Sequence, residues 1–188
     1  MKIAFIHHTF SLGSGIDTVI YELSKRLSKK HDVIVFTFYN EYKGNLNFEV
    51  KEVSIPFKKN RIVNAVLSPA FMYKLAEIRN YIKKYDVINT HLYPANIIPL
   101  IPYKVRNPLN IVTEWSVLTG SNLNLKLTEE LYIEFIKKMN KYAAKHADVV
   151  IAPCDFVKNW IKKEYGIEAV KMFLDGINFD LFDKNKPY

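Results

Sequence analysis

A glycine-containing turn near the N-terminus has the residue types of a phosphate-binding loop. Gly13 and Gly15 flank Ser14, after the apolar stretch KIAFI and before a helical pattern. Glycines let a ligand approach the backbone closely, and the free N–H groups of a helix N-terminus favour phosphate. Asp17 opposes this, because a carboxylate in the first helical turn competes with an anion. Ser14 and Asp17 also form a capping-box pattern, so a tight strand-to-helix connection explains the turn equally well.

The glycine spacing begins like a dinucleotide-binding fingerprint but does not complete it. Thr18 occupies the position of the third glycine. The acidic residue that should end the second strand is represented only by Glu41, which comes late. A dinucleotide-binding oxidoreductase domain is therefore an alternative with weak support.

A histidine and a glutamate–tryptophan pair follow two other apolar stretches. His91 follows DVINT, and Glu114 and Trp115 end NIVTEW. An imidazole transfers protons or forms hydrogen bonds, and an indole can stack on a sugar or a base. Each also has a structural explanation: His91 as a satisfied polar residue at a strand end, and Trp115 as part of the core.

The neighbouring histidines His7 and His8 follow the first apolar stretch. At most one of them faces a site, because successive strand residues point to opposite faces, and we take His8 as the candidate. Neither forms a metal site with His91 on a standard ligand spacing, so no metal is expected.

Strand-like and helix-like segments alternate along the chain, and this alternation predicts the fold. We expect seven strands, at KIAFI, DVIVFTF, FEVKEVSI (an edge strand), DVINT, NIVTEW, DVVIA and AVKMF. We expect helices at 16–27, 62–84 (with an interruption at Pro69), 94–104, 128–146 (with Thr128 as N-cap) and 155–165 (ended by Gly166). The result is a doubly wound, Rossmann-like parallel α/β sheet with helices on both faces. With strand order 3-2-1-4-5, the glycine turn and His91 should face one crevice at the carboxyl ends of the strands.

The composition fits one globular domain in a reducing compartment. The 188 residues are 49% hydrophobic and include a single cysteine, Cys154, which cannot form an internal disulfide. No signal peptide is evident, and the longest apolar stretch has about half of the ~20 residues that a membrane span needs, so we expect a cytoplasmic protein. The net charge of +8 is explained by lysines that coat helices. Basic and aromatic residues are not interleaved as on a nucleic-acid surface, so no nucleic-acid partner is expected.

Basic residues at the start of one predicted helix are compatible with contact to a membrane. Lys58, Lys59 and Arg61 precede a partly apolar segment at 62–72. Such a stretch can lie on an anionic bilayer, here the inner face of the cell membrane, or contact a lipid-linked acceptor. An ordinary core-facing helix with a basic start is the favoured interpretation.

Taken in order, these segments resemble the N-terminal domain of glycosyltransferase family 4, of the GT-B architecture. GSGIDTVIYELSKRLSKKHDVIVFT resembles the family's opening, with Gly15 on its second glycine and Asp17 on its usual glutamate. DVINTHLY resembles the strand that ends in a cleft histidine, here His91. IVTEWS resembles a segment in which the family often has histidine where Trp115 stands, and ADVVIAPCDFVKNWI and FLDGINFDLF resemble the end of the domain.

The resemblance implies part of a retaining glycosyltransferase. It implies an acceptor-side domain at 1–182, the start of a linker at 183–188, and a C-terminal donor-binding domain beyond it, so that the isolated chain would be inactive. A nucleotide-sugar would be the donor, a sugar or lipid-linked molecule the acceptor, and no metal or other cofactor would be needed. A non-catalytic binding module of the same fold remains the other hypothesis.

The resemblance also implies roles for the candidate residues. The glycine turn would lie against the donor diphosphate, and His91 would be catalytic, either as a general base or as a hydrogen-bonding group. The donor- or substrate-binding candidates are Gly13, Ser14, Gly15, His8, Glu114 and Trp115.

Overall fold

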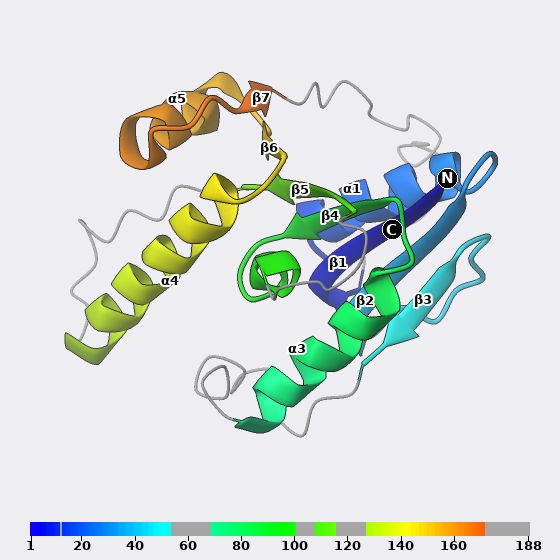
Figure 1. Cartoon of the computed structure of the whole chain (residues 1–188). Coiled ribbons are helices and arrows are strands. Elements are labelled where there is room, and N and C mark those ends of the chain that lie inside the picture. Colours follow the sequence, from blue (N-terminus) through cyan, green and yellow to red (C-terminus); the bar gives the residue numbers. More distant parts are fainter. Residues whose placement is uncertain (12, 54–68, 101–107, 116–126, 172–188) are drawn as a thin grey trace, which may run out of the picture.

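The computed structural model of the chain describes residues 1–11, 13–53, 69–100, 108–115 and 127–171 (Figure 1). Their strands form one parallel sheet in the order β3-β2-β1-β4-β5-β6-β7. The strands are β1 (Lys2–Phe10), β2 (Asp32–Asn40), β3 (Glu49–Glu52), β4 (Val87–His91), β5 (Leu109–Thr113), β6 (Val149–Ala152) and β7 (Val170–Lys171). The predicted seven-stranded sheet, its strand order and the edge position of the third strand are confirmed.

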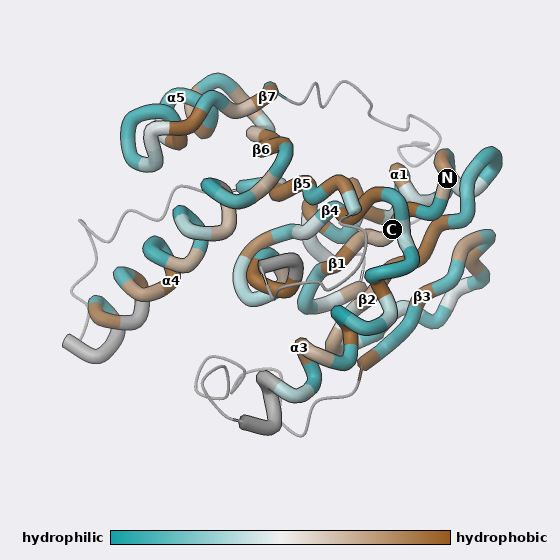
Figure 2. The backbone as a smooth tube through the Cα atoms, viewed as in Figure 1, coloured by the Kyte–Doolittle hydropathy of each residue, from teal (hydrophilic) through white to brown (hydrophobic). Residues whose placement is uncertain are grey.

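Helices cover both faces of this sheet. They are α1 (Gly15–Leu27), α3 (Pro69–Ile82), the 3-10 helix η2 (Ala95–Leu100), α4 (Leu127–Lys145) and α5 (Asp155–Tyr165). Alternation within β1 divides the core: Ile3 and Phe5 pack in one cluster with Ile20 of α1, whereas Ala4 and Ile6 pack in another with α3 and η2. The interior strands carry stretches of hydrophobic residues, whereas the edge strand β3 is largely hydrophilic (Figure 2).

The helix ends that the structure describes are close to the predicted ones, with one difference at the start of α4. Pro69 is the first residue of α3 as the structure describes it, and residues 62–68 of the predicted helix lie outside the described residues, so the interruption at Pro69 stays a prediction. Thr128 is not an N-cap: α4 begins at Leu127, so Thr128 already has helical backbone. Gly166 ends α5 as predicted, with a left-handed φ of 72°.

The predicted basic membrane contact falls at Lys58, Lys59 and Arg61, which lie outside the described residues. In the ranges that the structure describes, no helix is long and apolar enough to cross a membrane.

The topology brings the predicted crevice residues to one edge of the sheet. β1 pairs with β4 in parallel, with Ile6 opposite Thr90, and β1 continues past the end of β4 to Phe10, so the carboxyl ends of both strands point to the same edge. The turn that leads from β1 into α1 and the end of β4 at His91 therefore lie at the same edge, as predicted.

Candidate functional site

The centre of the site is His91, the last residue of β4, which is only 1% exposed. Its Nδ1 accepts a hydrogen bond of 2.8 Å from the indole Nε1–H of Trp115, and the two rings stack with centroids 5.9 Å apart. An indole N–H can only donate, so Nδ1 of His91 must carry a lone pair. In the neutral ring, the proton is therefore on Nε2.

The His91 ring is neutral, and its Nε2–H is available for a hydrogen bond. Burial, and secondarily the neighbouring His7, hold the pKa of His91 well below its usual value of 6.5. Nε2 is buried and has no hydrogen-bond partner among the described residues. Because an unpartnered buried donor is costly, this atom is poised to donate to a ligand.

His7 of β1 connects the end of β4 to the start of α1. Its Nδ1 lies 3.1 Å from the carbonyl oxygen of His91 and donates to it, while its Nε2 lies 3.6 Å from Oδ1 of Asp17. Burial is the largest influence on the pKa of His7 and lowers it, against the opposing effects of the His91 carbonyl and Asp17. The contact is therefore a neutral imidazole beside a carboxylate rather than a full ion pair.

The glycine turn begins α1 with open N–H groups. Ser14 is the N-cap, and its Oγ accepts a hydrogen bond of 3.1 Å from the N–H of Asp17, as predicted. The reciprocal half of the capping box is wrong: Oδ2 of Asp17 accepts from the N–H and Oγ–H of Ser11 instead, at 3.3 and 2.9 Å. Among the described residues, the N–H groups of Ser14, Gly15 and Ile16 then have no acceptor.

The described residues leave open space beside Gly15. A Cβ added at Gly15 would meet no described atom within 4 Å. Open space before unpaired N–H groups at a helix N-terminus is the arrangement that binds an anion. The carboxylate of Asp17 is held by Ser11, on the side of the strand ends, and its other oxygen lies 3.6 Å from Nε2 of His7.

Glu114 belongs to a separate buried cluster. Its side chain is 1% exposed, and its Oε1 accepts a hydrogen bond of 3.3 Å from Nδ2 of Asn140, on α4. Oδ1 of Asn140 accepts another, of 2.8 Å, from Nδ2 of Asn96 in η2. Burial raises the pKa of Glu114 to about 8, so this carboxyl group is largely protonated at neutral pH.

Glu114 and Trp115, which the sequence analysis placed together, therefore lie on opposite faces of the sheet. Trp115 contacts His91, whereas Glu114 is held by α4 on the opposite face of the sheet, because the alternation of β5 continues one residue past its end. His8 is half-buried, and its ring lies 4.3 Å from that of His7. It is His7, outside the candidate set, that contacts both Asp17 and His91.

The described part of the chain holds no cluster of three or more histidine, cysteine, aspartate or glutamate side chains that could bind a metal. Cys154 is exposed at the N-cap of α5 and makes no capping hydrogen bond with its side chain.

Comparison with known proteins identifies related folds. Residues 13–180 match the family model described as Glycosyltransferase Family 4. Among curated protein sequences, none matches the chain.

Solved structures resemble the chain at low sequence identity. Sucrose-phosphate synthase from Thermosynechococcus elongatus superposes with a TM-score of 0.71 at 14% identity, over 96% of this chain and 49% of that one. Anabaena HepE in complex with UDP-glucose gives 0.69 at 14% identity, over 97% and 46%. WaaG, a glycosyltransferase involved in lipopolysaccharide biosynthesis, gives 0.57 at 15% identity, over 88% and 42%. The chain thus spans about half the length of these structures, and at this identity the likeness concerns the fold.

Proposed function

The chain belongs to glycosyltransferase family 4, and from that premise we propose that it is the acceptor-side domain of a glycosyltransferase that uses a nucleotide-sugar donor. The proposal takes residues 1–182 as this domain and 183–188 as the start of a linker to a donor-binding domain. Two findings support it: the chain spans about half of the solved structures that it resembles, and one of these, HepE, holds UDP-glucose.

The observation that carries the proposal is the pairing of two kinds of donor at one edge of the sheet. The open N–H groups of Ser14, Gly15 and Ile16 suit the diphosphate of the donor. The buried Nε2–H of His91 suits a hydroxyl oxygen of the sugar or the acceptor. Neither set has a partner among the described residues, so both can be satisfied by substrate.

We assign these donors different parts of the transfer step. The bond between the sugar's anomeric carbon and the diphosphate oxygen breaks, a bond from that carbon to the oxygen of an acceptor hydroxyl forms, and the proton of that hydroxyl passes to the departing diphosphate. Negative charge grows on the departing diphosphate, and preorganised N–H groups at α1 stabilise it, in place of a metal. Retention of the anomeric configuration is part of the proposal, with a sugar or lipid-linked molecule as acceptor.

His91 is proposed as a hydrogen-bonding group rather than a general base. A general base must accept a proton, and Nε2 already carries one while Nδ1 is occupied by Trp115. The low pKa of the ring keeps it neutral. It therefore orients or polarises the reacting groups.

The test is sugar transfer by the whole protein, with the 188-residue chain as a control. Labelled sugar from UDP-glucose and from other nucleotide-sugars is followed in single-turnover reactions, to acceptor or, more slowly, to water. We expect turnover by the whole protein and none by the isolated chain. Transfer by the isolated chain would overturn the two-domain proposal, and a whole protein that binds no nucleotide-sugar would overturn the function.

A histidine pair tests the site within the same assay. His91→Ala should slow single-turnover transfer by about 10²-fold, the effect of losing one preorganised donor. His146→Ala is the matched control, because His146 is an exposed histidine away from the site, at the end of α4. Equal turnover by the two folded variants would reduce His91 to a structural residue.

A further inference from the structure

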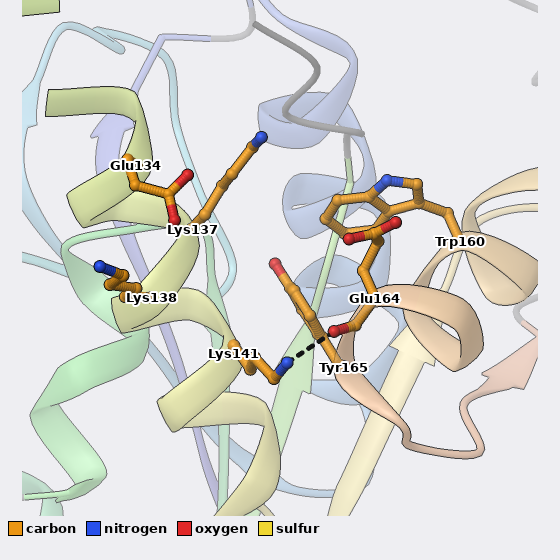
Figure 3. A pocket seen from close by; sticks show the side chains of 7 residues that line it. All are labelled: Glu134, Lys137, Lys138, Lys141, Trp160, Glu164 and Tyr165. Atoms are coloured by element: carbon orange, nitrogen blue, oxygen red, sulfur yellow. Dashed lines mark hydrogen bonds between the residues drawn. The ribbon is translucent and has the colours of Figure 1, made fainter. Parts of the chain in front are cut away.

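A pocket lies between α4 and α5, on the face of the sheet opposite α1. Its volume is about 250 Å³, and its lining residues are Glu134, Lys137, Lys138, Lys141, Trp160, Glu164 and Tyr165 (Figure 3). None of the residues around His91 lines it. The helices that form it pack on Val150 and Ala152 of β6, whereas His91 lies on the other face of the sheet. This α4–α5 pocket is therefore a second site, separate from the proposed transfer site.

Among the described residues, the lysines of the pocket form no ion pair within 4 Å. Lys137, Lys138 and Lys141 follow one another at helical spacing, so their positive charges repel across one surface of α4. Lys141 donates to the backbone carbonyl of Glu164 at 2.7 Å and keeps two further N–H groups for other acceptors. An anionic ligand would relieve the repulsion.

The hydroxyl of Tyr165 points into the same space. Tyr165 is only 4% exposed, and its hydroxyl has no hydrogen-bond partner among the described residues. Figure 3 shows it directed from α5 toward α4, on the side of Lys137. Burial is the largest of the effects that raise the pKa of Tyr165, so the hydroxyl keeps its proton and needs an acceptor.

An aromatic wall completes the pocket. The half-buried indole of Trp160 meets the ring of Tyr165 at 4.9 Å and 67°, which fixes the orientation of both rings. A flat apolar ring face beside charged and hydroxyl groups suits a ligand with an apolar face and a polar rim. A pyranose has that form, and the carboxylates of Glu134 and Glu164 can accept hydrogen bonds from its hydroxyls.

We propose that the α4–α5 pocket binds a sugar phosphate. The phosphate lies between Lys137 and Lys141, the sugar ring stacks on Trp160, and Tyr165 donates to an oxygen of the ligand. Lysine ammonium groups bind phosphate as point charges without a fixed geometry, which suits side chains that reach from one helix. This binding does not depend on sugar transfer, so the site stands or falls independently of the proposed function.

The test follows the two tryptophans of the 188-residue chain by NMR during titration with glucose 1-phosphate. Trp115 and Trp160 give two indole N–H signals, which Trp160→Phe or Trp115→Phe assigns by the loss of one peak. We expect saturable movement of the Trp160 signal, with a dissociation constant near or below the millimolar range, while the Trp115 signal stays in place. Glucose and inorganic phosphate, each lacking half of the ligand, should bind at least about tenfold more weakly.

Charge variants separate this site from general attraction to lysine. The double variant Lys137→Gln, Lys141→Gln should lose at least about tenfold in affinity for glucose 1-phosphate. Lys163→Gln is the matched control, because Lys163 is an exposed lysine of α5 that does not line the pocket. No movement of the Trp160 signal, an equal response to inorganic phosphate at the same ionic strength, or equal losses in the two charge variants would each overturn the proposal.

Discussion

Replacing Glu114 with glutamine should stabilise the domain increasingly as pH rises. Glu114 is buried, has a pKa of about 8 in the folded chain, and keeps one carboxyl oxygen without a described partner. A glutamine side chain at this position would preserve the shape and the oxygen that accepts from Asn140, but it cannot ionise. The substitution therefore removes only the penalty of a buried titratable carboxyl.

The size of the effect follows from the pKa in the two states. The unfolded chain has an ordinary glutamate pKa of 4.5, against about 8 when folded. Between these values the folded state holds a proton that the unfolded state has released, so the free energy of unfolding falls as pH rises. The loss reaches ~3 kcal/mol at pH 7 and ~5 kcal/mol above pH 8, both upper limits because water entry and local relaxation reduce such penalties. Below pH 4.5 the stability of the wild type carries no such penalty.

Urea denaturation of the chain at pH 5, 7 and 9 measures this difference. The free energies of unfolding of wild type and Glu114→Gln should be close at pH 5 and diverge by a few kcal/mol at pH 9. Glu130→Gln is the matched control on the exposed side of α4 and should change stability by less than about 0.5 kcal/mol at each pH. Parallel profiles for wild type and Glu114→Gln across this range would refute the assignment of a raised pKa to this carboxyl.

Four further substitutions test the proposed transfer site. Gly15→Val should change the free energy of unfolding by less than ~1 kcal/mol, because its Cβ meets open space among the described residues. The same variant should weaken nucleotide-sugar binding by the whole protein at least about tenfold, as measured by calorimetry. Normal affinity in the folded variant would count against the phosphate site. Ser14→Ala should lower the urea-unfolding free energy by ~1 kcal/mol through loss of the N-cap, while Ser14→Thr keeps most of it; equal losses would contradict the capping role. In nitrogen NMR, His91 should show the Nε2–H tautomer, and Trp115→Phe should shift it toward a mixture; a wild-type ring protonated on Nδ1 would exclude the assigned hydrogen bond.

The parallel α/β sheet could be predicted from the alternation of strand-like and helix-like segments. Parallel strands that are covered on both faces have a recognisable local pattern, a short continuous run of apolar residues. Continuous apolar runs indicated strands covered on both faces, and the weaker alternation of FEVKEVSI indicated an edge. The same logic placed the glycine turn and His91 at one edge of the sheet. The exact helix boundaries were harder to predict from the sequence. α4 begins before Thr128, because a hydroxyl side chain does not by itself determine the residue at which a helix begins.

Side-chain contacts of the site were only partly predictable. Period-two alternation from Ile3 and Phe5 puts His7 on their face, toward α1, and would have selected His7 over His8. It would also have separated Glu114 from Trp115. The pair Asn96 and Asn140, 44 residues apart, follows no local spacing, because such contacts arise only from tertiary packing.

His7 contacts both the end of β4 and the first turn of α1, and these contacts do not involve the loops that follow them. Its Nδ1 donates to the carbonyl of His91, its Nε2 lies 3.6 Å from the carboxylate of Asp17, and that carboxylate accepts a hydrogen bond from Ser11 at the start of the glycine turn. The glycine turn and the end of β4 are thus both in contact with one residue of the central strand β1. Because His7, Asp17 and His91 all belong to regular elements, a change of length or sequence in the loops that follow Ser11 or His91 would leave these contacts in place.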